Sequence, residues 1–179
     1  MIIWENQYSE NIKDYKGYPI GKTLQYLTDP KIISLAGGLP SPDVFQISEF
    51  RTISEKILAN DIDKIMQYSA IPGEQSLLDA LIGFLKRDNI HIEKKNILIT
   101  SSGQHGLDLV GRAFLNKGDI VLIDRPTFAG ALVAFEMGKP KFIGFDIEQD
   151  GTNVQALEET IKQLQIKNQL PKLIYVIPD

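Results

Sequence analysis

The sequence predicts an α/β fold built on a partial, doubly wound and mostly parallel sheet, preceded by an N-terminal arm. Between residues 97 and 177, short apolar segments alternate with amphipathic segments of helix length. At the first of these junctions, residues 97–108, four apolar or β-branched residues lead into serines and a glycine and then into a helix pattern. Strands connected by such helices pair in parallel and are covered on both faces.

The first third of the chain carries less regular patterns. Residues 1–30 are rich in tyrosine and interrupted by glycine and proline, which is typical of an arm that lies across another subunit or domain. A disordered tail with one short helix is the alternative that these residues leave open. After the arm we expect a strand at 32–35, a helix capped by Ser48, and a helix at 74–87.

The alternating part predicts four strands and three helices. The strands are expected at residues 97–100, 120–123, 141–145 and 173–177. The helices are expected at residues 103–116, 127–137 and 153–166.

The composition fits an ordinary globular domain and argues against several functions. With 43% hydrophobic residues, 23% charged residues and a net charge of −4, the chain has no clustered basic surface for nucleic acid. It contains no cysteine, which removes disulfides and thiolate chemistry. His91 and His105 are far apart in the sequence, and no Asp or Glu stands at a spacing that makes a convincing metal site with either. No stretch is apolar enough to span a bilayer or to act as a leader, so we expect a cytoplasmic protein without a membrane partner.

Two turns are candidate binding sites. The amides at Ser102, Gly103 and Gln104 begin a helix, where they lack intrahelical acceptors and lie at the positive end of the dipole, so they suit a phosphate. A plain helix cap explains the same residues equally well. Gly38, in the turn after the predicted strand at 32–35, leaves a bare amide that could approach a carboxylate, and an unusual backbone angle is the alternative reason for it.

Four segments together resemble the fold type I pyridoxal-phosphate enzymes, the class I/II aminotransferases. The subgroup that they resemble includes 2-aminoadipate and kynurenine aminotransferases and the aminotransferase-like domain of MocR-type regulators. The segments stand in the family's order at residues 33–45, 67–73, 97–108 and 124–128.

The resemblance implies pyridoxal phosphate as cofactor and gives several residues a role. Ser102, Gly103 and Gln104 match the turn that holds the cofactor phosphate, and Phe128 matches the aromatic residue that stacks on the pyridine ring. Tyr68 matches a tyrosine that reaches across a dimer interface to the neighbouring subunit's cofactor phosphate. Without the resemblance, Phe128 would be interpreted as a core residue and Tyr68 as a loop aromatic.

The resemblance also implies a domain division and a substrate position. Residues 1–30 form the arm, residues 31–73 lead into the large domain and carry a glycine-rich substrate loop, and residues 74–179 are the first part of the cofactor-binding large domain. Gly38 lies where the family places backbone near the substrate carboxylate. Strands from later in the family's chain separate strand 97–100 from the other strands.

The activity that the resemblance implies is transfer of an amino group from an amino acid to a 2-oxo acid, by a homodimer. This chemistry needs a Schiff-base lysine, an acidic partner for the pyridine nitrogen and an arginine for the substrate carboxylate. The family places all three beyond the position of Asp179, and no lysine here has the family's serine-rich context. We therefore expect a truncated chain, the amino-terminal half of such an enzyme, that is inactive without the carboxy-terminal half.

Two other functions remain compatible with the sequence. One is a non-catalytic, aminotransferase-like regulatory or interaction domain. The other is an unrelated doubly wound domain that binds a nucleotide phosphate at the same turn, with Gly103, Gly106 and Asp124 as part of a dinucleotide fingerprint.

Overall fold

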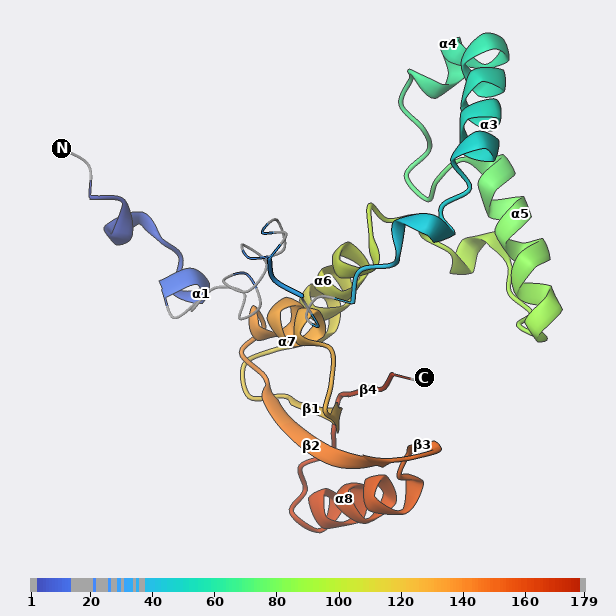
Figure 1. Ribbon diagram of the computed structural model, residues 1–179. Coiled ribbons are helices and arrows are strands. Elements are labelled where there is room, and N and C mark those ends of the chain that lie inside the picture. The colour runs from blue at the N-terminus through green and yellow to red at the C-terminus, as the bar shows by residue number, and fades with distance from the viewer. Residues whose placement is uncertain are drawn as a thin grey trace. The chain divides into compact units, whose positions relative to one another are not determined.

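The structure is a computed structural model that describes residues 3–13, 21, 26, 29, 31–33, 35 and 38–177 (Figure 1). These residues fall into two compact units, which are described separately. The sheet unit comprises the described residues of Met1–Gly37 together with residues 101–177, and the helical unit is Gly38–Thr100. The domain boundaries expected after residues 30 and 73 stay a prediction.

A four-stranded sheet in the order β3-β2-β1-β4 is the centre of the sheet unit. The central strand β1 (Ile120–Arg125) pairs in parallel with β2 (Lys141–Glu148) on one side and with β4 (Leu173–Tyr175) on the other. Strand β3 (Gly151–Thr152) returns antiparallel to β2. The α/β class and the mostly parallel sheet are confirmed, whereas the sequence did not predict the β2-β3 hairpin.

Helices cover both faces of this sheet (Figure 1). Helices α6 (Gly103–Phe114) and α7 (Ala129–Glu136) pack on one face and α8 (Val154–Ile166) on the other. Alternate residues of β1 pack into the cores on opposite faces of the sheet, because successive strand side chains point in opposite directions. The core under α6 and α7 consists of Leu115, Val121, Ala131, Ala134 and Phe135. The core under α8 consists of Ile120, Leu122, Phe145 and Leu164.

Local signals account for the starts of α6 and α8 in the sheet unit. Helix α6 begins at the predicted Gly103, and α8 begins after Asn153, whose side-chain oxygen accepts the Ala156 amide at 2.7 Å. Helix α7 begins two residues later than predicted, with Phe128 in the extended N-cap position at φ −72° and ψ 117°. The ring of Phe128 is therefore carried by the loop after β1.

The helical unit contains three α-helices. They are α3 (Ile47–Asn60), α4 (Ile62–Ile65) and α5 (Gln75–Leu85). Short 3₁₀ turns lie at η2 (Pro42–Val44), η3 (Lys86–Asp88) and η4 (Lys94–Asn96). Helix α5 is the one predicted at 74–87. The prediction that Ser48 caps α3 is wrong, because the N-cap is Gln46, which makes no side-chain capping bond.

Two predicted strands are not formed in the described residues. Residues 97–100 join no ladder, although Ile97 has the extended angles φ −116° and ψ 134°. An extended segment that pairs with no strand forms no ladder hydrogen bonds, and the expected separation of residues 97–100 from the other strands stays a prediction. Ile32, Ile33 and Leu35 are likewise not in a strand, and Ser34 lies outside the described residues.

The expected N-terminal arm is described only in part. Its described residues include η1 (Trp4–Gln7) and α1 (Glu10–Lys13), and Lys139 Nζ donates to the Glu10 carbonyl at 2.8 Å. Residues 14–20 and several that follow lie outside the described part of the chain. Among the helices that are described, none has the length and apolar character needed to cross a membrane.

Candidate functional site

The start of α6 has the geometry of an anion site. Ser102 is the N-cap, and its Oγ accepts the His105 amide at 3.2 Å, while the Ser101 amide donates to His105 Nδ1 at 3.3 Å. The amides of Gly103 and Gln104 begin the helix, where no intrahelical carbonyl is within reach. A Cβ added to Gly103 would meet nothing within 4 Å, so the space beside this turn is open.

The side chain of Gln104 does not face that open space. Its Nε2 donates to the Gly130 carbonyl at 2.7 Å, which ties the first turn of α6 to the first turn of α7. Gln104 therefore has its backbone amide available for an anion, while its side chain holds two helix starts together.

Phe128 and Gln104 meet at Gly130. A Cβ added to Gly130 would overlap the ring carbons Cε1 and Cζ of Phe128 and would lie 2.5 Å from Gln104 Oε1. Only glycine leaves room for both side chains there. The ring of Phe128 is 45% exposed, so a flat apolar face lies open beside the helix start. Gly130 carries no signal in the sequence, because it stands within a helix pattern that other small residues would satisfy.

A cavity of about 290 Å³ lies where β1, β2 and β4 end. In parallel sheets, ligands bind beyond the carboxyl ends of the strands. Within the described structure, the hydroxyl of Thr127 is buried without a hydrogen-bond partner, which favours a ligand or another chain segment as that partner. The cavity is lined by Asp124, Pro126, Thr127, Phe128, Ile147 and Ile177.

Asp124 lines this cavity as a buried carboxylate that is 1% exposed. Its Oδ2 accepts the Ile177 amide at 2.7 Å, and its Oδ1 accepts from Thr152 Oγ1 at 3.3 Å. These two bonds use both oxygens of the carboxylate. In a dinucleotide site, the same carboxylate would have to accept hydrogen bonds from a ribose. The structure therefore argues against that interpretation.

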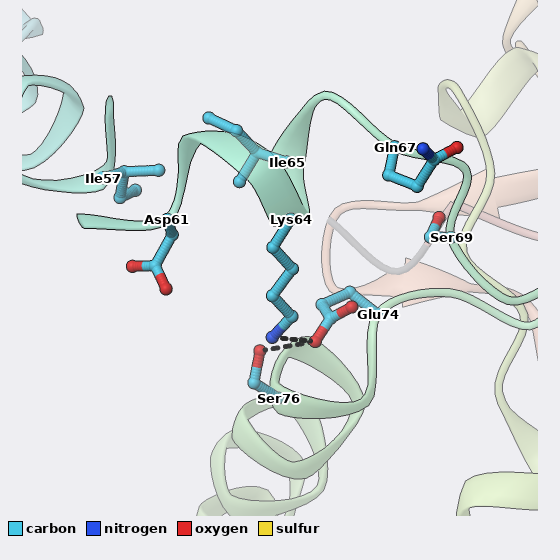
Figure 2. A pocket seen from close by; sticks show the side chains of 8 residues that line it. All are labelled: Ile57, Asp61, Lys64, Ile65, Gln67, Ser69, Glu74 and Ser76. Carbon is cyan, nitrogen blue, oxygen red and sulfur yellow. Dashed lines mark hydrogen bonds and ion pairs between the residues drawn. The ribbon is translucent and has the colours of Figure 1, made fainter. Parts of the chain in front are cut away.

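Tyr68 lies in a loop of the helical unit and is 98% exposed. An ion pair holds the two ends of this loop together, since Lys64 Nζ in α4 lies 2.8 Å from Oε1 of Glu74, the N-cap residue of α5 (Figure 2). Ser76 Oγ donates to the same oxygen at 3.3 Å. Figure 2 shows these three side chains meeting among the residues of α3, α4, the loop and the start of α5 that line a pocket of about 590 Å³.

The ion pair shifts the pKa values of both partners. The hydrogen bond from Lys64 lowers the pKa of Glu74, and the Ser76 bonds add to that effect against partial desolvation. The hydrogen bond to Glu74 raises the pKa of Lys64. Both groups stay charged at neutral pH, so the pair persists there.

The same loop is also fixed near its end at Gly73. Gly73 has φ +123°, and a Cβ on it would overlap the side chain of Ile99. The Ile99 amide donates to the Pro72 carbonyl at 2.9 Å. The segment that leads along the chain to Ser101 is thus packed against the loop that carries Tyr68.

Gly38 is exposed and has φ +56°, and a Cβ added to it would meet nothing within 4 Å. This backbone conformation explains the glycine without a ligand, so the substrate role of Gly38 stays a prediction. Gly38 and Tyr68 belong to the helical unit, whereas Ser102, Gly103, Gln104 and Phe128 belong to the sheet unit. The structure brings together the phosphate turn and the stacking residue, and the binding role of each predicted residue stays a prediction.

An open helix start, an exposed ring and a cavity at the carboxyl edge of a parallel sheet are typical of an α/β enzyme that binds a phosphorylated ligand. Residues 31–177 match the family Aminotransferase class I and II. The chain belongs to this family.

Similar proteins agree with the family. The chain is 35% identical to aromatic-amino-acid aminotransferase 1 of Thermococcus litoralis, over 99% of this chain and 43% of that protein. It superposes on kynurenine aminotransferase of Pyrococcus horikoshii, solved in complex with PMP, with TM-score 0.89 and 35% identity over 97% of this chain and 43% of that one. It also resembles an alpha-aminoadipate aminotransferase of Thermus thermophilus, complexed with N-(5'-phosphopyridoxyl)-L-leucine, with TM-score 0.82 and 29% identity over 99% of this chain and 42% of that one.

These findings define the fold and indicate the cofactor. The chain spans about two fifths of the length of the relatives that it matches. Its partial sheet is that of the large domain of fold type I aminotransferases. The family and the two complexes indicate pyridoxal phosphate.

Proposed function

We propose that this chain is part of a pyridoxal-phosphate-dependent aminotransferase that moves an amino group from an amino acid to a 2-oxo acid. The observation that carries the proposal is the meeting of Gln104 and Phe128 at Gly130. It sets an anion-binding helix start beside an exposed aromatic face, as a ligand with both a phosphate and a planar ring requires.

The residues of the sheet unit fit this cofactor. The amides of Gly103 and Gln104 and the hydroxyl of Ser102 would hold the phosphate, and Phe128 would lie against the ring. When bound, the cofactor supplies the electron sink that the chemistry requires. The unpartnered hydroxyl of Thr127 supports a polar group on the ligand or on a further chain segment at this position.

We infer that the lysine that anchors the cofactor comes from residues outside this chain. The cavity beside Phe128 has no lysine among its described lining residues. Several lysines of the described chain are engaged elsewhere, in pairs with carboxylates. These are Lys13, Lys64, Lys94, Lys95, Lys162 and Lys172. The chain by itself is then inactive.

Assembly with more protein is part of the proposal. Residues 38–100, all of them described, contain a single buried hydrophobic side chain, that of Leu78. A unit of this size without a larger core requires further apolar contacts for stability. We propose that a carboxy-terminal aminotransferase half and a second subunit provide them, with Tyr68 reaching the cofactor phosphate of that second subunit.

Reconstitution tests the proposal. The chain would be mixed with the carboxy-terminal part of a relative, beginning at the residue that aligns after Asp179, and assayed for amino transfer between amino acids and 2-oxo acids. We expect activity only in the mixture, and a large loss with Phe128→Ala. Activity of the lone chain would refute the placement of the lysine, and a mixture that binds cofactor without amino transfer would favour a regulatory domain.

A further inference from the structure

Asp124 occupies the point where the ladder between β1 and β4 stops. The last paired residues of this ladder are Ile123 and Tyr175. One residue further along β1, the side chain of Asp124 replaces the backbone as acceptor and accepts the Ile177 amide at 2.7 Å. The carboxylate thus extends the attachment of the β4 segment beyond the backbone pairing.

The second oxygen of Asp124 reaches another element. Its Oδ1 accepts from Thr152 Oγ1 at 3.3 Å, and Thr152 belongs to the β2-β3 hairpin. A carboxylate that is 1% exposed depends on such bonds, since burying it without them is costly. Asp124 therefore joins three segments: the end of β1, the hairpin and the segment after β4.

Two of these segments line the cavity beside Phe128, through Ile147 of β2 and Ile177 after β4. Phe128 itself follows Asp124 by four residues. We propose that Asp124 is a positioning residue of the cofactor site, which fixes the segment after β4 and the hairpin around the loop that carries Phe128. This inference rests on the proposed function, and it gives a role to a residue outside the predicted site.

Asp119 provides a matched comparison at the opposite end of β1. Its Oδ2 accepts the Asn116 amide at 2.8 Å and lies 3.3 Å from Lys172 Nζ, just before β4. The pKa of Asp119 is lowered, chiefly by the Asn116 amide. Both aspartates thus bind one backbone amide and one side-chain donor, but only Asp124 lines the cavity.

Hydrogen exchange tests the attachment directly in the 179-residue chain. We expect Asp124→Ala to speed exchange of the Ile177 amide by about 10- to 100-fold, because a bond to a charged group is lost. Asp124→Asn keeps an oxygen acceptor and should stay within about threefold of wild type. Asp119→Ala should leave the Ile177 amide unchanged. If Asp124→Ala does not fold, Thr152→Val, which removes only the hairpin bond, replaces it and should give a smaller increase.

Equilibrium dialysis against pyridoxal phosphate, with each variant chain mixed with the carboxy-terminal part used for reconstitution, tests the consequence for the site. We expect Asp124→Ala to weaken binding about tenfold or more, with recovery in Asp124→Asn and no change in Asp119→Ala. Equal losses in the two alanine variants, or an Asn variant as weak as Ala, would overturn the positioning role. A reconstituted wild-type mixture that binds no pyridoxal phosphate would refute the proposed function and this role in it, while the exchange result would still report on the attachment.

Discussion

At the scale of single residues, Gly130 is sterically constrained, although the neighbouring sequence does not indicate it. A methyl group there would overlap the Phe128 ring and crowd Gln104 Oε1, so one of these side chains would have to move. We expect Gly130→Ala to lower the free energy of unfolding by about 1–3 kcal/mol, as overpacking does. Thermal unfolding measures the loss, and dialysis should show weaker binding of pyridoxal phosphate.

Gly83 in α5 is the control for this substitution. A Cβ at Gly83 meets nothing within 4 Å, so Gly83→Ala should raise stability by about 0.5–1 kcal/mol through helix propensity alone. A Gly130→Ala variant as stable as Gly83→Ala would show that the overlap relaxes at no cost.

Ser102 combines a cap with a proposed ligand contact, and the two roles can be separated. Ser102→Ala removes the bond to the His105 amide and should cost about 0.5–2 kcal/mol. Asn153→Ala removes the equivalent cap of α8 at a similar cost. Only Ser102→Ala should reduce the rise in melting temperature that inorganic phosphate produces. Equal protection by phosphate in both variants would mean that Ser102 is a cap alone.

At the scale of elements, the loop that carries Tyr68 is held by Gly73 against Ile99. Gly73→Ala combines backbone strain at φ +123° with overlap of the Ile99 side chain. Gly118→Ala, at φ +88° and in open space, has the strain alone. We expect the Gly73 variant to be less stable than the Gly118 variant by about 1–3 kcal/mol, measured by denaturant unfolding.

Ile99→Ala should recover part of this difference in the double variant. It removes the Cγ1 atom nearest to the new methyl group and leaves the Ile99 amide bond to Pro72 in place. Additive effects of the two substitutions would show that Gly73 and Ile99 do not interact.

The Lys64 and Glu74 ion pair gives the same loop a pH dependence. The pKa of Glu74 is lowered on folding, so its contribution to stability is present above the ordinary pKa of glutamate and is lost as the pH falls through the lowered value. The pKa of Lys64 is raised, so its contribution is lost only as the pH rises through that raised value.

We therefore expect Glu74→Gln to lower the melting temperature slightly at neutral pH, because the pair is exposed. The difference from wild type should vanish in acid and in strong alkali. A difference that persists in acid would assign the effect to the N-cap position of Glu74 rather than to its charge.

At the scale of the whole molecule, apolar surface is the dominant feature. Helix α3 has no buried residue, and its Phe50 side chain is 76% exposed. Exposed apolar surface of this extent favours the proposed assembly with further protein. We expect the isolated chain to bind a hydrophobic dye and to sediment as concentration-dependent oligomers. A monodisperse monomer without dye binding would contradict the proposed assembly.

Features that depend on neighbouring residues follow directly from the amino-acid pattern. The alternating apolar pattern from residue 120 onward predicted the parallel sheet, and the serine and glycine at 102–103 predicted the start of α6 at the right residue. Four motifs in order predicted the family. These signals are local, because they follow from side-chain periodicity and from the unsatisfied amides of a helix start.

Features that depend on residues far apart in the sequence arise only in the folded chain. Residues 97–100 have the sequence pattern of a strand but pair with no strand in the described chain, so they form no ladder. Gly130 is required because Phe128 and Gln104 pack against it, and the buried Asp124 side chain accepts hydrogen bonds from Thr152 and Ile177. Contacts between separate segments cause strand pairing, steric overlap and burial of a charge. The pattern of residues along one segment therefore cannot predict them.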